Sequence, residues 1–145
     1  MYNTLEKLYC IADKEKINIF ENNWSSASAR IFEIDENYVI ALAKNNIQNS
    51  LQEKEVLAEE LGHYYCNALY YLNDNPIQRA KCEYRAKKWA YAALVPLQIL
   101  KQKLVDGINN IYELADYFDV EPKYMNDCID FYKEIDAFHG KMWAE

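Results

Sequence analysis

The sequence lacks any long hydrophobic run. It contains no span of about 20 residues without charged side chains, which is the length that a membrane-spanning helix requires. Met1 to Thr4 leads straight into a charged amphipathic stretch, without the basic segment and apolar core of an export signal. The sequence therefore predicts neither a membrane anchor nor an export signal.

Paired cysteines are also lacking. The 4 cysteines are widely scattered, and none belongs to a C-x-x-C pair. Disulfide scaffolds and zinc knuckles are built on closely spaced cysteines, so neither class is indicated. A reduced cytoplasm is the compartment that this cysteine usage predicts.

An excess of basic residues is lacking too. The chain has 16 Lys and Arg against 23 Asp and Glu, which gives a formal charge of −7 at pH 7. Nucleic-acid phosphates and anionic lipids repel such a chain, so we expect protein or peptide partners and no direct binding to nucleic acid or membrane. The 145 residues contain no internal repeat or low-complexity tract, and 51% of them are hydrophobic. One domain with a packed core is predicted.

The hydrophobic pattern predicts a mostly helical α+β domain with a small antiparallel sheet. A first helix, capped by Thr4, is expected to end near Asp13. Residues of high β-propensity predict strands at 17–20, 29–34 and 38–42, with a turn at 35–37. Further helices are predicted from about 53 to 72, from 76 to just before Pro96, and at 97–105, 111–118 and 122–138.

One of these helices carries Glu59-Glu60-Leu61-Gly62-His63, which differs from the H-E-x-x-H motif of zinc peptidases in having Glu at its first position. Residues 59 and 63 lie one helical turn apart and point the same way, so both can bind one metal ion. Glu60 lies beside His63, where it can contact a metal-bound water without binding the metal. Alone the motif is weak, because two surface glutamates and a half-buried histidine give the same pattern.

A catalytic zinc site needs three protein ligands and an open fourth position for water. The helix that begins at residue 76 offers Glu83 as the third ligand, since it is the single charge on an otherwise apolar face. The other members of that face are Ala86, Ala90 and Ala93. A buried carboxylate has to be neutralised, paired with a cation or bound to metal. Metal meets that requirement, and a basic partner such as Arg79 or Lys87 is the alternative.

We therefore expect Glu59, His63 and Glu83 to hold zinc, with Glu60 as the catalytic base. Gly62 supports the site indirectly, because a glycine inside a helix costs roughly 1 kcal/mol relative to alanine and implies the close approach of a neighbouring strand. A di-iron carboxylate site in a helical bundle is a second interpretation. It requires two Glu-x-x-His motifs, and the sequence has one.

Leu57 to Tyr64 resembles the active-site helix of the ImmA/IrrE family of metallo-endopeptidases, which occur in phages and mobile elements. Several members of that family carry the same Glu-for-His variant. The segments that extend the resemblance are Glu83-x-x-Ala86-x-x-Trp89-Ala90, Leu94-Val95-Pro96, Tyr112-Glu113-Leu114-Ala115 and Phe118-Asp119-Val120. Together they cover most of the chain from about residue 30 to residue 134.

The resemblance implies a zincin-like fold, with residues 1–145 as one metallopeptidase domain and 108–138 as a helical pair packed at its C-terminal end. It also implies a sheet beside the metal-binding helix, so that an extended substrate adds as a strand to the sheet edge, expected at Tyr38 to Leu42. Relatives that act as regulators cleave the helix-turn-helix repressor of their own mobile element. A repressor of a phage or mobile element is therefore the expected substrate.

Glu59 departs from the H-E-x-x-H pattern. Two glutamates and one histidine form a harder, more anionic ligand set than two histidines and one glutamate, so a bound water is expected to be acidified less. The alternatives are a catalytically silent protein-binding regulator with the same fold and a structural α-rich protein whose four acidic and imidazole groups are surface charges. Residues 111–138 have the outline of a helix-turn-helix, but their eight acidic residues against Lys123 and Lys133 predict repulsion from DNA.

Overall fold

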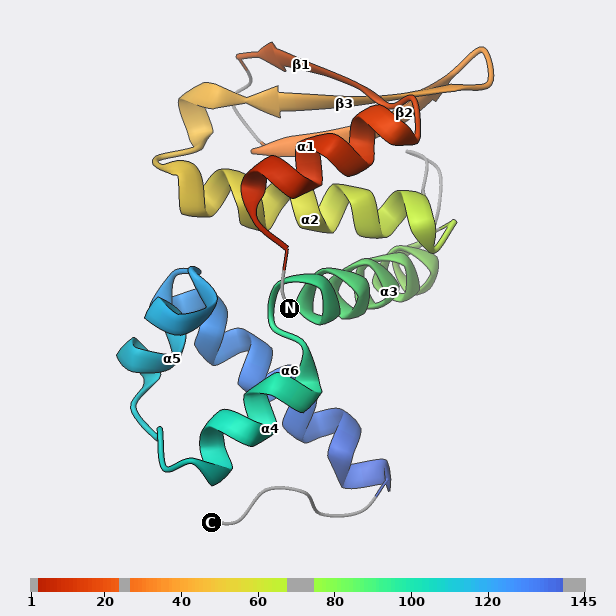
Figure 1. Cartoon of the computed structure of the whole chain (residues 1–145). Coiled ribbons are helices and arrows are strands. Elements are labelled where there is room, and N and C mark those ends of the chain that lie inside the picture. Colours follow the sequence, from red (N-terminus) through yellow and green to blue (C-terminus); the bar gives the residue numbers. More distant parts are fainter. Residues whose placement is uncertain (1–2, 24–26, 68–74, 140–145) are drawn as a thin grey trace. The chain divides into compact units, whose positions relative to one another are not determined.

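The computed structural model of the chain describes residues 3–23, 27–67 and 75–139, with side chains as far as residue 135. The chain forms two compact units, one made of Asn3–Leu94 and one that begins at Val95 (Figure 1). Whether the two act as the single expected domain over 1–145 stays a prediction.

The unit of residues 3–94 begins with a capped helix. The Oγ1 of Thr4 accepts a hydrogen bond from the backbone N–H of Lys7 at 3.3 Å and so caps α1 (Leu5–Lys14). The elements that follow are β1 (Asn18–Asn22), β2 (Ala29–Ile34), β3 (Asn37–Ala43), the short 3-10 helix η1 (Lys44–Asn46), α2 (Ser50–Tyr65) and α3 (Pro76–Leu94). The predicted strands and helices of this unit are confirmed, although their ends shift.

The largest shift is at the C-terminal end of α2. The helix ends at Tyr65, before the predicted Leu72, because Asn67 takes a left-handed φ of 50° that does not continue a right-handed helix. Residues 68–72 of that prediction lie outside the described residues.

The sheet is mixed, with the strand order β1-β3-β2. β2 and β3 form an antiparallel hairpin whose turn residues Asp35 and Glu36 both have positive φ, the geometry of a two-residue hairpin turn. β1 then pairs with the other side of β3 in the parallel direction. The predicted small sheet is confirmed, but the expectation that all of it is antiparallel is wrong for β1.

β3 is therefore the central strand, since it is paired on both sides. The expectation that Tyr38 to Leu42 forms the free edge is wrong, because β1 adds beside β3 and leaves β2 at an edge. The acceptor of the Ala43 N–H is the carbonyl of Ser28, at 2.8 Å. Residues 28, 30 and 32 thus turn their backbone groups toward β3, and residues 29, 31 and 33 turn theirs outward.

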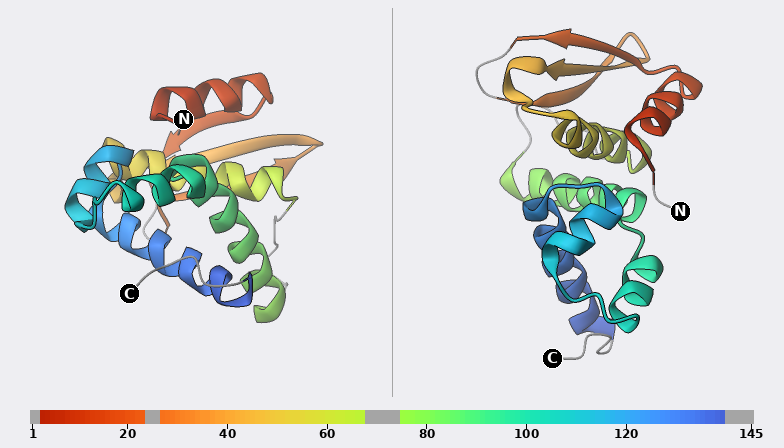
Figure 2. Two further views of the ribbon diagram at one scale, coloured as in Figure 1. Left: turned by 60° about the horizontal axis from the view of Figure 1, so that its bottom comes forward. Right: turned by 60° about the vertical axis from the view of Figure 1, so that its left-hand side comes forward.

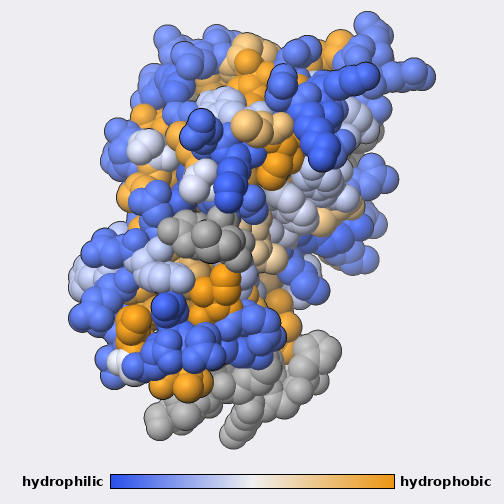
Figure 3. All heavy atoms as spheres, in the orientation of Figure 1, coloured by the Kyte–Doolittle hydropathy of each residue, from blue (hydrophilic) through white to orange (hydrophobic). Residues whose placement is uncertain are grey.

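One face of the sheet packs on α2, and the other is exposed. Ile31, Ile40 and Leu42 are buried on the inner face, where the ring of Tyr38 also contacts that of Tyr64 from α2, at 5.0 Å between centroids. Both views in Figure 2 place α2 along this side of the sheet. The outer face carries exposed apolar side chains, and Figure 3 shows hydrophobic surface in this part of the molecule. These exposed side chains are Phe20, Phe32 and Ile34.

The unit that begins at Val95 is helical in its described part. Its elements are α4 (Leu97–Val105), α5 (Ile111–Phe118) and α6 (Pro122–His139). Asn110 caps α5 by accepting the N–H of Tyr112 at 2.8 Å, and Asp119 ends the helix at a φ of 57°. The residues at the centre of this unit are Leu100, Leu114, Phe118, Met125 and Cys128. The predicted helices at 97–105 and 111–118 are confirmed residue for residue.

The architecture is that of a mostly helical α+β protein, which confirms the predicted fold class. None of the helices in the described part of the chain has both the length and the apolarity needed to cross a membrane.

Candidate metal centre

α2 carries two of the proposed ligands. The side chain of Asn49 caps the helix by accepting the Gln52 N–H at 2.9 Å. Leu57, Ala58 and Leu61 are fully buried, so this face of the helix is anchored in the core. The rotation about the helix axis is thereby determined, and Glu59, Glu60 and His63 fall on the remaining faces.

α3 carries the third proposed ligand. Asn75 caps this helix through the N–H of Gln78 at 2.9 Å, and Pro76 occupies its first turn, where a missing N–H has no cost. Ala86 and Ala90 are buried with 0% and 2% exposure, as the apolar face predicts. Glu83 lies one turn before Ala86 on that face.

Gly62 is the point of closest approach between α2 and α3. A Cβ added to it would lie 3.0 Å from the Cα of Ala86 and closer still to the Ala86 carbonyl oxygen. The sequence correctly indicated a close neighbour, but that neighbour is a helix and not a strand. Its backbone approaches because alanine offers only a methyl group on the facing side.

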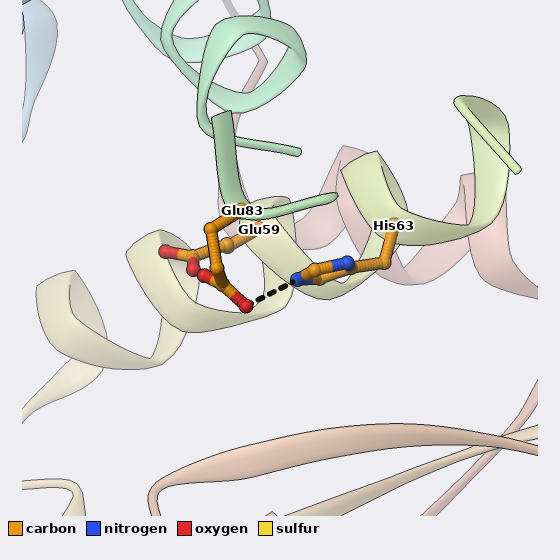
Figure 4. A group of neighbouring side chains, drawn as sticks. All are labelled: Glu59, His63 and Glu83. Carbon is orange, nitrogen blue, oxygen red and sulfur yellow. Dashed lines mark ion pairs between the residues drawn. The ribbon is translucent and has the colours of Figure 1, made fainter. Parts of the chain in front are cut away.

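The three proposed ligands come together at this helix pair. One donor atom from each of Glu59, His63 and Glu83 lies within 4.8 Å of the other two. The Nε2 of His63 is 3.3 Å from Oε1 of Glu83, and Figure 4 shows this contact with Glu59 beside it. The His63 side chain is 6% exposed and that of Glu83 is 35% exposed. A buried histidine contradicts the alternative in which all four residues are surface charges.

The carboxyl of Glu59 is held in an unfavourable place for a charge. Burial, which is the largest cause, acts together with a hydrogen bond to Glu83 and repulsion from that carboxylate to raise its pKa to about 7, and Lys87 opposes the rise. A protonated Glu59 therefore donates to the carboxylate of Glu83. In the metal-free protein Glu83 thus lies between two partners, with Glu59 on one side and His63 on the other.

The carboxyl of Glu60 is also perturbed. Its pKa is raised to about 7, chiefly by burial and in addition by the charge of Glu83. His63, the backbone N–H of Ile31 and the Arg30 guanidinium act in the opposite direction. Ile31 belongs to the free edge of β2, and its outward N–H donates to the Glu60 carboxylate. Glu60 is thereby tied to the sheet edge while Glu59 and His63 turn toward α3.

A cavity of about 100 Å³ opens between these elements. Its walls are Ala27, Ala29, Arg30 and Ile31 on the side of β2, and Glu60, His63 and Glu83 on the helices. This volume has room for water beside the imidazole and the two carboxylates, since a water takes up about 30 Å³ in the liquid. The cavity brings the edge strand, the candidate base and two candidate ligands to one place.

The donor set suits a divalent metal ion. Zinc is bound by imidazole nitrogen and carboxylate oxygen at about 2.0–2.2 Å, so two ligand atoms of a tetrahedral site lie about 3.4 Å apart. The donor atoms lie within 4.8 Å of one another, so the widest pair has to approach by up to about 1.4 Å to reach that spacing. Three ligands leave a fourth position free, and the adjoining cavity supplies the room for it.

A family model described as the IrrE N-terminal-like domain, Peptidase_M78, matches residues 12–126, which is most of the chain. The chain belongs to this family. Peptidase_M78 membership makes it a peptidase at the level of the family, and a metallopeptidase family implies a metal. Comparisons with curated proteins and with solved structures give no significant match.

The residues matched by the Peptidase_M78 model include α2, α3 and the three strands. Sequence reasoning had named the residues on the helices, but not Arg30 and Ile31 on the cavity wall. Their contribution depends on how β2 pairs and on which of its backbone groups face outward. Arg30 offered one signal, as the single basic residue in a predicted strand of otherwise apolar and acidic residues.

Proposed function

We propose that this chain is a zinc-dependent endopeptidase in which Glu59, His63 and Glu83 hold the ion and Glu60 is the catalytic base. The observation that supports it most is the convergence of three donor atoms beside a water-sized cavity that Glu60 also lines. When bound there, the ion acidifies a water and polarises the scissile carbonyl.

The chain's own residues supply the proton transfers. A carboxyl with a pKa of about 7 accepts and returns a proton readily at neutral pH, which suits Glu60 to general acid–base work. Glu60 takes the proton of the attacking water and later gives it to the nitrogen of the leaving amine. The Ile31 N–H orients the carboxylate that performs both transfers, because it holds one of its oxygens at the edge of β2.

The substrate class that fits best is an extended protein segment. β2 is an edge strand beside the cavity, and its outward backbone groups have no ladder partner within the sheet, although the Ile31 N–H donates to Glu60. A segment that pairs with this edge lies across the cavity mouth in a defined register. Folded helices do not present such backbone groups, so the scissile segment has to be extended.

A helix-turn-helix repressor of a phage or mobile element is the specific substrate that we propose. The resemblance to regulators that cleave such repressors is one reason. Charge is a second one, because DNA-binding proteins carry basic surfaces and this chain has a formal charge of −7. Opposite charges speed the encounter of two proteins and favour partners of this type.

A catalytically silent protein-binding regulator is the second candidate, and Glu59 favours it. Two carboxylates already balance the charge of a divalent ion, so a water on that ion loses its proton less readily than on a site with two imidazoles. In this case the same cavity and edge strand hold a partner without cutting it.

Metal analysis and a cleavage assay on matched variants separate the two. The full chain, Glu60→Gln and the exposed control Glu134→Gln are purified without chelator and incubated with a mixture of unstructured peptides, which is read by mass spectrometry. For an endopeptidase we expect bound zinc in all three and cleavage products in all but Glu60→Gln. Zinc without products in the unmodified chain supports the silent regulator, and equal cleavage by Glu60→Gln contradicts the role of the base.

A further inference from the structure

Gly62 occupies a position that no other residue can fill without moving a helix. A Cβ there would meet backbone atoms of Ala86, at 3.0 Å to Cα and 3.1 Å to the carbonyl carbon, with the oxygen closer. Backbone atoms cannot rotate away as a flexible side chain can. We propose that Gly62 is a positioning residue of the metal centre, because its missing side chain sets the separation of α2 and α3 that brings Glu83 to Glu59 and His63. This inference rests on the metal centre of the proposed function.

The contact lies in the middle of a row of three pairs that join the two helices. Glu59 pairs with Glu83 through a hydrogen bond between their carboxyls. Gly62 meets Ala86 one turn farther along both helices, and Tyr65 stacks on Trp89 after one more turn, with ring centroids 5.0 Å apart. A spacer introduced at the middle pair acts directly on the neighbouring pair, which carries two of the ligands.

The size of the displacement decides whether it matters. An ordinary contact to a Cβ begins at 3.4 Å, and the Cα of Ala86 lies at 3.0 Å, so α3 has to withdraw by at least 0.4 Å. Metal–ligand distances are defined to about 0.2 Å. The shift that relieves the contact is therefore more than about twice that tolerance, because the carbonyl oxygen of Ala86 is closer than its Cα. His63 moves with α2 and Glu83 with α3, so the spacing between the ligands changes.

The effect of Gly62→Ala on stability shows whether the close contact with α3 matters. Without a close neighbour, Gly62→Ala stabilises a helix, since alanine is the better helix former. We expect the opposite here, a lower melting temperature for Gly62→Ala of the metal-free chain. A structural role alone predicts that change too, so metal affinity is the deciding measurement.

The deciding experiment measures the affinity of the folded full chain for Zn²⁺ by competition with a chromogenic chelator, and the ligand field by Co²⁺ absorption. Folding is verified by circular dichroism at a temperature below each melting transition. For Gly62→Ala we expect roughly 10- to 100-fold weaker binding, as for other changes that misplace a ligand. The control Ala90→Gly destabilises α3, the other helix of the pair, without adding an atom between the helices, and we expect its metal affinity and Co²⁺ spectrum to equal those of the unmodified chain.

A double-mutant cycle tests whether Gly62 acts through Glu83. In a Glu83→Gln background the third ligand is already weakened, so Gly62→Ala should add much less than its effect in the unmodified chain. Full additivity overturns the proposal. So does unchanged metal affinity of a folded Gly62→Ala.

A second variant keeps the inference testable if Gly62→Ala does not fold. Glu83→Asp withdraws the carboxylate by one methylene while the helices stay in place, and a rigid spacing predicts a loss of affinity of at least tenfold. Binding as tight as that of the unmodified chain overturns the inference. A chain that binds no metal overturns it as well, whereas metal binding without peptide cleavage refutes the peptidase and leaves this inference standing.

Discussion

Glu59 stands where the H-E-x-x-H pattern has a histidine, and its surroundings are acidic. Glu60 and Glu83 both raise its pKa, in addition to burial, which is the largest cause. A proton on Glu59 relieves part of this repulsion in the metal-free protein. A divalent cation held there, as we propose, would do the same, so the proton and the metal would compete for one carboxyl.

This competition predicts a strong pH dependence of metal affinity. Below a pKa of about 7 each binding event has to displace the proton of Glu59, so the affinity should rise about tenfold per pH unit there and level off above it. Chelator competition between pH 5.5 and 8.5 measures it. Glu59→Gln should flatten this rise as well as weaken binding. An affinity of the unmodified chain that does not change across this range contradicts the role given to Glu59.

The raised pKa of Glu60, the proposed base, predicts that the stability of the metal-free protein depends on pH. Its folded pKa of about 7 lies above the ordinary 4.5, so the folded state binds the proton more tightly, and stability is lost as pH rises between these values. Glu60→Gln removes that loss and retains an acceptor for the Ile31 N–H. We expect it to raise the free energy of unfolding at pH 8 by up to about 3 kcal/mol and to change it little at pH 4. Urea denaturation at both pH values measures this, with Glu134→Gln as the unaffected control.

At the scale of the elements, one acidic residue joins three segments of the N-terminal unit. Glu53 on α2 accepts a hydrogen bond from the Tyr9 hydroxyl of α1 at 2.6 Å and one from Nζ of Lys44 in η1 at 2.5 Å. Burial alone raises the pKa of Glu53, but the hydrogen bonds from Lys44 and Tyr9 outweigh it and the net shift is downward. Glu53 thus connects the start of α2 to α1 and η1.

Glu53→Gln should therefore destabilise the protein by roughly 1–3 kcal/mol at pH 7, since it weakens two charge-assisted hydrogen bonds at a nearly buried position. A folded pKa below the ordinary value means that this stability is present above that value and lost as pH falls through the folded one. The difference between Glu53→Gln and the unmodified chain should therefore shrink in acid. Thermal unfolding of both proteins at pH 7 and pH 3 measures this change. A stability difference between them that is equal at the two pH values would contradict the stabilising role of the ionised Glu53.

Local sequence signals were sufficient for most elements. Pro96 and Gly107 restrict the backbone on either side of α4, and both α4 and α5 were predicted at their observed bounds. The position of β3 in the sheet could not be predicted in this way, because it depends on β1 pairing in parallel beside a hairpin. The neighbour of Gly62 depends on helix packing in the same way.

The candidate site also has one part that local sequence signals predicted and one part that they could not predict. The spacing of Glu59, Glu60 and His63 was enough to predict that they lie close together on one helix. The apolar face of α3 was enough to single out Glu83. The cavity wall at Arg30 and Ile31 arises from the outward orientation of alternate residues on an edge strand. That orientation follows from strand register, which no single segment encodes.

At the scale of the whole molecule, the net negative charge determines which partners are attracted and which are repelled. With a net charge of −7, and with acidic residues outnumbering basic ones along α5 and α6, the chain is repelled by phosphate backbones. We predict no retardation of duplex DNA in a gel-shift assay at 150 mM salt, even at micromolar protein. Retardation that weakens as salt rises would contradict this prediction and would indicate that the helix-turn-helix-like segment 111–138 binds DNA.

The central claim is that one ion sits between α2 and α3 on two carboxylates and an imidazole. X-ray absorption at the zinc edge of the zinc-loaded full chain tests it directly. We predict that the zinc ligands are nitrogen and oxygen alone at about 2.0–2.2 Å, with the outer scattering of one imidazole. In Glu83→Gln we expect this ligand shell to be lost. A shell that contains sulfur at about 2.3 Å, or one that is unchanged in Glu83→Gln, would place the ion elsewhere and contradict the claim.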